Sequence, residues 1–308
     1  GSGLVVECQI ISGIPYDMPG MSSEAREVFE QCAESRRHIS VDVKTGHATL
    51  KIPLVELFAD DSLREPLKLA LTCDEHGQFY VQLGNAARHL AIQGLKGEAY
   101  IVPLRDGRVV RVDAETLKLN GGDFKIAPVY RYGTQHKPTM EPQLFGYSVA
   151  YKDGCVESYD FMCSDGKSES VALTSYTLPS GGRLDFAYDG FQLSKVTKGT
   201  VTLLEVEQRL AGSGNVPGAS FSIPKSIVVF PDSQNEKKTY RFTNPSGNSL
   251  QMTLELDGFG AQGKVIYCLS RDSAGRLTGI AIEQQHPFTV DKKTLRRSNH
   301  ADLQTAQP

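Results

Sequence analysis

Residues 151–160 read YKDGCVESYD, in which an Asp-Gly pair stands between segments whose polarity alternates. The same pair occurs at five places in the chain: Asp106-Gly107, Asp153-Gly154, Asp165-Gly166, Asp189-Gly190 and Asp257-Gly258. Asp and Gly tolerate positive φ at both central positions of a type I′ turn, whose twist matches the strands that it joins. The five pairs therefore predict hairpin tips. A carboxylate held at a loop tip for catalysis is the weaker interpretation, because turn geometry already accounts for both residues.

Alternation of apolar and polar residues predicts strands with one buried face. It runs through residues 67–72, 183–188 and 250–256, and a period of two returns side chains to the same face of a strand. The apolar set changes parity after Leu54 and again at Leu203-Leu204. A β-bulge, or a strand that passes from one sheet to another, produces such a change.

Two segments of the chain are similar to each other. TLPSGGRLDFAYDGF begins at Thr177 and TNPSGNSLQMTLELDGF begins at Thr243, and both contain Pro-Ser-Gly, a Leu and a closing Asp-Gly-Phe. This similarity predicts a repeated hairpin unit. A triplet of glycine, a basic residue and an aliphatic residue predicts the start of a strand after a turn at three places: Gly182-Arg183-Leu184, Gly263-Lys264-Val265 and Gly275-Arg276-Leu277.

Helical spacing is confined to SSEAREVFEQCAESRRH at residues 22–38, where Ala25, Val28 and Phe29 share one face. The expected fold is therefore all-β, an extended antiparallel hairpin meander with one short N-terminal helix. The small residues of AGSGNVPGAS, at 211–220, predict a linker. The chain is expected to comprise an N-terminal arm with the helix, a β-sheet region, continuing hairpin repeats and a polar tail, at residues 1–38, 39–210, 220–290 and 291–308 respectively.

Composition excludes several classes of protein. The 308 residues carry 33 Lys and Arg against 36 Asp and Glu, a net charge of −3, which gives no electrostatic footprint for nucleic acid. The six cysteines show no CxxC pair or zinc-ribbon spacing and are expected to be reduced, mostly buried thiols. No apolar run approaches the length of a membrane span, and Glu7 interrupts the apolar start, which therefore does not read as a signal peptide. The expected location is the cytoplasm before non-classical export, or secretion without a classical signal peptide.

SRDSAGRLTGI at residues 270–280 resembles the repeat of the RHS or YD-repeat family, which includes bacterial polymorphic toxins and the shell proteins of insecticidal toxin complexes. Asp272, Gly275, Arg276 and Leu277 match that repeat, and Arg271 stands where the family has Tyr. PSGGRLDFAYDGFQLSKV is similar to the repeat, VKTGHATLKIPL to the segment that leads into it, and RDGRVVRV and YKDGCVESYD to the hairpins between them. The order of these motifs along the chain strengthens the resemblance.

The resemblance implies a curled β-sheet that, in large members of the family, winds into a hollow shell around a toxic C-terminal polypeptide. This chain is too short to enclose such a cargo, its repeats are few, and nothing in it matches the family's self-cleavage region or a following toxin domain. The implied role is a non-catalytic scaffold that contacts a toxin, an effector or further shell segments, or associates with itself. The chain is then either a fragment of a larger shell or a small independent relative.

Other functions are weighed against simpler interpretations. Glu205 and Glu207 share one face of a strand, as a carbohydrate-binding or carbohydrate-active β-protein could use them, although a solvated polar face is the simpler interpretation. Cys155 or Cys163 with a histidine could form a nucleophile, but a core thiol explains Cys155 better. Ser180 suits a turn better than a nucleophile elbow. A chaperone or immunity partner of a toxin is a third alternative.

No metal, cofactor or catalytic residue is assigned from the sequence. Four histidines lie in or near predicted turns without a second ligand at metal spacing: His47, His76, His89 and His136. Ser246 is interpreted like Ser180, as a turn residue. Gly212 and Gly214 imitate part of a phosphate loop, but no Lys-Ser pair follows them. The basic residues near the C-terminus, including Lys292 and Lys293, are interpreted as a solvated tail.

Overall fold

In the computed structural model, the described residues form strands and turns and contain no helix. These residues are 5–8, 38–41, 48–74, 76–84, 90–93, 99–133, 138–164, 168–190, 192–208, 223–245, 247–248, 250–259, 264–284 and 291–295. The all-β class expected from the sequence is confirmed for them. The helix predicted at residues 22–38 lies outside this part of the chain, apart from His38. No helix in the described ranges is long and apolar enough to cross a membrane.

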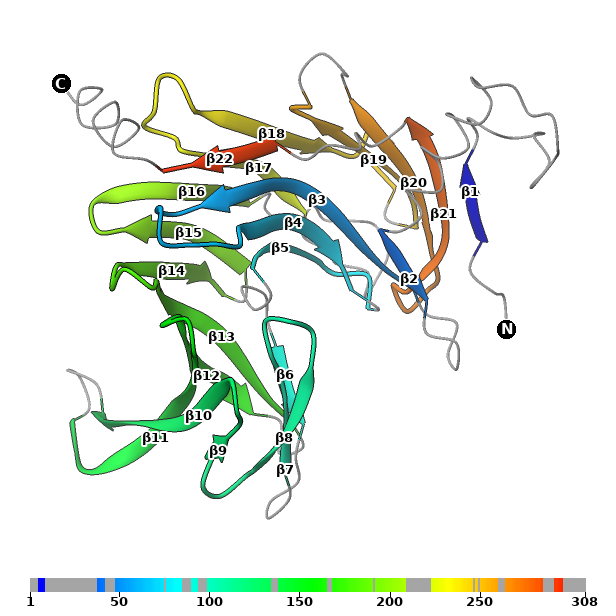
Figure 1. Cartoon of the computed structure of the whole chain (residues 1–308). Helices are drawn as coiled ribbons and strands as arrows, with labels where there is room; N and C mark the ends of the chain where they lie inside the picture. Colours follow the sequence, from blue (N-terminus) through cyan, green and yellow to red (C-terminus); the bar gives the residue numbers. More distant parts are fainter. Residues whose placement is uncertain are drawn as a thin grey trace, which may run out of the picture.

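A long antiparallel ribbon dominates the fold (Figure 1). Each strand from β9 to β21 pairs with the next strand along the chain, so the predicted meander is confirmed. The strands are β9 (Leu119–Asn120), β10 (Phe124–Gly133), β11 (Pro138–Tyr151), β12 (Val156–Ser164), β13 (Ser168–Thr177), β14 (Arg183–Asp189), β15 (Gln192–Lys198), β16 (Val201–Gln208), β17 (Pro224–Val229), β18 (Lys238–Thr243), β19 (Gln251–Asp257), β20 (Val265–Arg271) and β21 (Leu277–Gln284). Two further strands join this sheet, β1 (Val5–Cys8) parallel to β21 and β6 (Leu90–Gln93) antiparallel to β13.

A smaller sheet lies inside the curve of the ribbon (Figure 1). It contains β2 (Ile39–Val41), β3 (Ala48–Phe58), β4 (Leu67–Cys73), β5 (Phe79–Leu83) and β22 (Asp291–Thr294), in the order β2-β3-β4-β5 with β22 parallel to β3. A separate hairpin is formed by β7 (Ala99–Pro103) and β8 (Val109–Asp113). The two sheets therefore form two layers, with the ribbon outside.

One hydrophobic core joins the two layers. The Tyr240 hydroxyl of β18 donates a hydrogen bond to the Leu54 carbonyl of β3 at 2.8 Å, and the Gln192 side chain donates to the Phe79 carbonyl at 3.0 Å. Buried polar groups cost free energy unless they are paired, so these bonds fix the inner sheet in one position on the ribbon. Whereas the family resemblance implies a hollow shell, the chain's own sheet packs against the part of this ribbon between β15 and β21.

Asp106-Gly107 and Asp153-Gly154 form tight hairpin tips as predicted, but their turn type is not the predicted one. At Asp106-Gly107 and Asp153-Gly154 only the glycine has positive φ, 88° and 93°. The Asp Oδ1 accepts the N–H of the residue two positions later, Arg108 or Cys155, at 3.0 Å. Such a bond suits a right-handed Asp, so each turn is a type I turn closed by a glycine bulge rather than a type I′ turn.

The other three Asp-Gly pairs differ from these two. Asp189-Gly190 is also at a tight hairpin tip, because Asp189 of β14 pairs with Gln192 of β15 across a connection of two residues, in which Gly190 has a φ of 60°. Asp257-Gly258 is not a tight tip, because residues 258–264 separate β19 from β20. Asp165-Gly166 connects the paired strands β12 and β13 but lies outside the described residues.

The parity changes in the sequence are confirmed as bulges. The register of β3 against β4 shifts between Pro53 and Val55, which leaves Leu54 as the extra residue. The register of β16 against β15 shifts between Thr202 and Leu204, which leaves Leu203 as the extra residue. Both bulges let one strand turn apolar side chains toward the core on either side of the shift.

Three further predictions from the sequence can be compared with the structure. The three glycine-basic-aliphatic triplets stand at the starts of β14, β20 and β21, as predicted. The predicted linker lies outside the described residues, and the strands on either side of it, β16 and β17, pair with each other. The prediction of a polar tail is wrong for residues 291–295, because β22 extends the inner sheet and Leu295 is buried. Residues 296–308 lie outside the described part.

Candidate functional site

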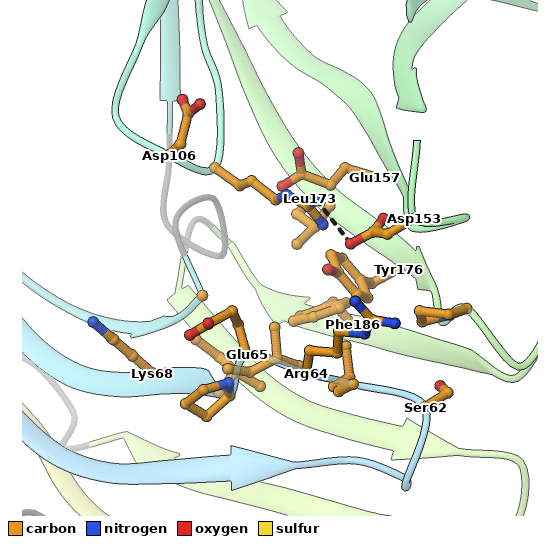
Figure 2. A pocket seen from close by; sticks show the side chains of 17 residues that line it. Ser62, Arg64, Glu65, Lys68, Asp106, Asp153, Glu157, Leu173, Tyr176 and Phe186 are labelled. Carbon is orange, nitrogen blue, oxygen red and sulfur yellow. Dashed lines mark ion pairs between the residues drawn. The ribbon is translucent and has the colours of Figure 1, made fainter. Parts of the chain in front are cut away.

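A pocket of about 580 Å³ opens where the inner sheet meets the first part of the ribbon. One wall comes from residues 62–68, which connect β3 to β4 and begin β4. The opposite wall comes from Arg105 and Asp106 at the β7–β8 turn, and from side chains of β12, β13 and β14. Figure 2 shows the charged side chains of Arg64, Glu65 and Lys68 on the first wall.

Asp60 holds the first wall in place. Its Oδ1 accepts the Ser62 N–H at 2.9 Å, and its Oδ2 accepts the Ser180 hydroxyl at 2.5 Å, across 120 residues of sequence. Lys198 pairs with the same carboxylate at 3.5 Å. Burial raises the pKa of Asp60, but the hydrogen bonds from Ser180 and Ser62 outweigh it and hold the pKa below its usual value. The β3–β4 connection is therefore tied to the β13–β14 turn through a charged carboxylate.

Arg105 is the cation of the opposite wall. Its guanidinium pairs with Asp153 at 2.8 Å, as the dashed line in Figure 2 marks, and lies 4.0 Å from the centre of the Tyr151 ring. The backbone N–H of Arg105 also donates a hydrogen bond to the Tyr151 hydroxyl at 3.0 Å. Burial alone would raise the pKa of Asp153, but the hydrogen bond from Arg105 lowers it below its usual value. This guanidinium is therefore fixed by an ion pair and a cation–π contact.

Glu157 is a buried carboxyl group that lines the pocket together with Arg105. Its side chain is 3% exposed and accepts hydrogen bonds from the hydroxyls of Tyr151 and Tyr159, the latter at 3.0 Å. Tyr159 stacks on Tyr147 with ring centroids 4.8 Å apart. Burial raises the pKa of Glu157 above its usual value, and the two tyrosine hydrogen bonds offset only part of that effect.

The buried groups around Glu157 favour binding over covalent chemistry. Burial raises the pKa of the Cys155 thiol, which therefore stays protonated near neutral pH and is not an activated nucleophile. Burial also raises the pKa of Tyr176 and of Tyr151, so neither phenol serves as a base near neutral pH. What the site offers is a fixed guanidinium beside a wall of aromatic and aliphatic side chains.

Glu157→Gln is expected to change how stability depends on pH. Between the ordinary carboxyl pKa of 4.5 and the raised pKa, the folded protein keeps a proton on Glu157 that the unfolded chain has lost. The free energy of unfolding of the wild type therefore falls as pH rises through this window, by at most about 1.4 kcal/mol per pH unit from this group. The amide cannot titrate, so the variant lacks this contribution.

Urea denaturation of both proteins at several pH values from 4.5 upward measures this difference. The matched control is Glu207→Gln, because the Glu207 side chain is 61% exposed and pairs with Lys225 on the protein surface. We expect its stability to follow that of the wild type across the same range. A constant difference between the wild type and Glu157→Gln would contradict a raised pKa at this carboxyl.

The chain matches no protein-family model and no curated protein.

The carboxylates singled out in the sequence lie elsewhere. Glu205 and Glu207 occupy the exposed face of β16, as the solvated interpretation predicted, with side chains 50% and 61% exposed. They pair with Lys195 at 3.9 Å and Lys225 at 3.3 Å respectively. Leu204, which precedes Glu205 in the strand, is fully buried. The structure does not bring these two carboxylates to the pocket.

The other candidates that the structure describes also lie outside the pocket. Cys155 is a buried thiol, as expected, and Ser180 is a turn residue whose hydroxyl accepts the Gly182 N–H at 3.2 Å. His76 is exposed in the turn between β4 and β5. The side chain of Cys163 and the remaining candidates lie outside the described part of the chain: His47, His89, His136, Gly212, Gly214 and Ser246. Among the described side chains, no three His, Cys, Asp or Glu gather closely enough to hold a metal ion.

Sequence reasoning missed Glu157 and Arg105, although a signal for Glu157 existed. In YKDGCVESYD, Glu157 has the same parity as Cys155 and Tyr159, which are both buried. A carboxyl group on the apolar face of a strand is uncommon, because an unpaired buried charge is costly. Arg105 gave no comparable signal, since its partners depend on how the β7–β8 hairpin packs against the ribbon.

Proposed function

We propose that this protein is a non-catalytic β-sheet scaffold of the RHS-like kind, which makes protein contacts in a bacterial toxin or secretion system. The observation that carries the proposal is an open strand edge at one end of the ribbon. β9 covers β10 only at Lys125 and Ile126, so residues 127–133 pair with β11 alone in the described part of the chain. An open edge offers backbone groups to an added strand.

Exposed aromatic side chains accompany this edge. Tyr130 is 53% exposed and Tyr132 is 67% exposed, and Leu144, directly across from Tyr130 on β11, is 37% exposed. Tyrosine is enriched at the energetic centres of protein interfaces. Pro128 lacks an N–H and thereby limits strand addition to the part of β10 that follows it. We name Tyr130, Tyr132 and Leu144 the arm patch.

The partner in this proposal is a toxin, an effector or a further shell segment. The resemblance of the motifs at residues 179–196 and 270–280 to RHS repeats supports this class of partner. A ribbon made of sequence-adjacent hairpins is also the architecture that the resemblance implies, and further hairpins could continue it at the β10 edge. The proposal includes no catalytic residue.

Binding to the purified products of the neighbouring coding sequences tests this function. We expect one of them to bind with a Kd that Tyr130→Ala/Tyr132→Ala weakens about 10-fold or more. Val109→Ala is the matched control, because Val109 is a 59% exposed apolar residue on β8 and outside the arm patch. If no product binds and the chain stays monomeric at about 100 μM, the scaffold proposal is wrong. Equal binding by the double variant would remove the arm patch from it.

No specific observation favours the carbohydrate alternative at the residues on which it rested. Glu205 and Glu207 lie on an open strand face and are paired with lysines. A glycosidase needs its two carboxylates on opposite sides of a bound sugar.

A further inference from the structure

We propose that the pocket between the inner sheet and β12–β14 binds a small organic anion with a flat apolar body, of the aromatic carboxylate class. This inference does not depend on the scaffold function, because the pocket and the arm patch share no residue.

The size and the walls of the pocket suit an apolar body. Its volume of about 580 Å³ lies within the range of small-molecule sites, which is about 300–1,000 Å³. Leu63 of the first wall and Leu173, Tyr176 and Phe186 of the opposite wall are each less than 9% exposed. Two of these four side chains carry aromatic rings, which stack favourably with a planar ligand.

The carboxylates at the pocket are mostly neutralised by the protein itself. Asp153 pairs with Arg105, and Asp106 pairs with Arg108 at 2.6 Å. Glu157 also lines the pocket, and both of its carboxyl oxygens are occupied by tyrosine hydroxyls. Its raised pKa lowers its negative charge further.

The cations of the first wall are not neutralised in this way. Arg64 and Lys68 are exposed, and neither forms an ion pair or a side-chain hydrogen bond with any residue that the structure describes. Glu65 between them is likewise unpaired within the described ranges. The uncommitted charge at the pocket is therefore two cations against one carboxylate.

This balance decides the class of ligand. A carboxylate placed near Arg64 and Lys68 gains charge-assisted hydrogen bonds, and the aromatic body beside it displaces water from Leu173 and Phe186. A cationic ligand would instead meet the uncommitted charges of Arg64 and Lys68, with only Glu65 to pair it. A ligand of many hydroxyl groups would leave the apolar walls without a matching surface.

The probe for the experiment is 2-naphthoate, with 2-naphthalenemethanol as its neutral analogue. Ligand-observed NMR titration of the full chain should give a Kd of about 0.1–1 mM for 2-naphthoate, the affinity that a ligand of this size reaches. The neutral analogue should bind at least about 5-fold more weakly, because it lacks the carboxylate that the cations recognise.

Two variants locate the site. Arg64→Glu/Lys68→Glu should weaken 2-naphthoate binding about 10-fold or more. Leu63→Trp should abolish it by filling the pocket. The matched control is Arg111→Glu/Lys125→Glu, which changes the net charge by the same amount at two exposed strand residues outside the pocket. We expect this control to bind within about 2-fold of the wild type, the loss that long-range electrostatics alone can cause.

Each outcome of these binding experiments either supports or overturns the proposal. The proposal is overturned if 2-naphthoate does not bind at 5 mM (about five times the weakest expected Kd), if the alcohol binds as tightly, or if both charge-reversal variants lose affinity equally. Thermal unfolding of each variant shows whether it is folded. Should Leu63→Trp fail to fold, the comparison of the two charge-reversal variants still decides the outcome. A failure here leaves the partner assay at the arm patch unaffected.

Discussion

Gly77→Ala is expected to lower the free energy of unfolding by about 3–5 kcal/mol, whereas Gly107→Ala lowers it by about 1 kcal/mol. Both glycines occupy the same position in the same kind of turn, with φ of 75° and 88°. In each turn the glycine N–H donates to the carbonyl three residues earlier, at 3.0 Å. The backbone strain of an alanine is therefore similar at the two positions.

The surroundings of the two glycines differ. A Cβ at Gly77 would lie 1.9 Å from the Gly275 carbonyl oxygen and 2.5 Å from Arg271 Nη2, whereas a Cβ at Gly107 has nothing within 4 Å. Gly77 and Gly275 belong to turns of the inner sheet and of the ribbon, and Arg271 joins them by donating to the Gly77 carbonyl at 2.8 Å and to the Gly275 carbonyl at 2.9 Å. An added methyl group must push these two backbones apart.

Urea denaturation of the two variants and the wild type measures both losses. Gly107→Ala serves as the control for the cost of positive φ alone. Equal losses in the two variants would show that the turns around Gly77 and Gly275 do not pack against each other as described.

Tyr240→Ala is expected to lower the free energy of unfolding by about 4 kcal/mol, whereas Tyr240→Phe lowers it by about 1–2 kcal/mol. Tyr240 is 1% exposed, and its hydroxyl reaches the Leu54 carbonyl 186 residues away. Removing the ring leaves a cavity between the two layers. Removing the hydroxyl alone leaves a buried carbonyl without that donor.

The control for this prediction is Tyr132→Ala, which removes the same atoms from a residue that is 67% exposed. We expect its unfolding free energy to stay within about 0.5 kcal/mol of the wild type. Thermal and urea denaturation provide the comparison. A loss in Tyr240→Ala as small as in the control would mean that the inner sheet is not packed on β18.

The ribbon was predictable because its determinants are local. Alternation marks the strands, and the parity changes at Leu54 and Leu203 identify two bulges without any knowledge of the partner strands. The turn type was missed because the sequence shows which residues tolerate positive φ but not which hydrogen bond the Asp side chain makes. The Asp153 side chain accepts a hydrogen bond from the Cys155 N–H, and only Gly154 in this turn has positive φ.

The inner sheet and the pocket were not predictable in the same way. Their contacts join residues far apart in the chain, as Ser180 joins Asp60 and Arg271 joins Gly77. The periodicity of one segment does not show which distant segment packs against it. β22 was missed because four residues with two lysines have no alternation, and only the neighbouring β3 makes them a strand.

The pairing of β22 with β3 has a consequence for how the protein forms during synthesis. Hairpins of the ribbon can assemble one after another as they leave the ribosome, because each strand needs only its predecessor. β3 is synthesised before β22, so its edge at residues 55–58 stays unpaired until residues 291–294 have left the ribosome. Until then this edge offers backbone groups to which another strand can add. A nascent chain that stalls before Asp291 is therefore the form most in need of a chaperone.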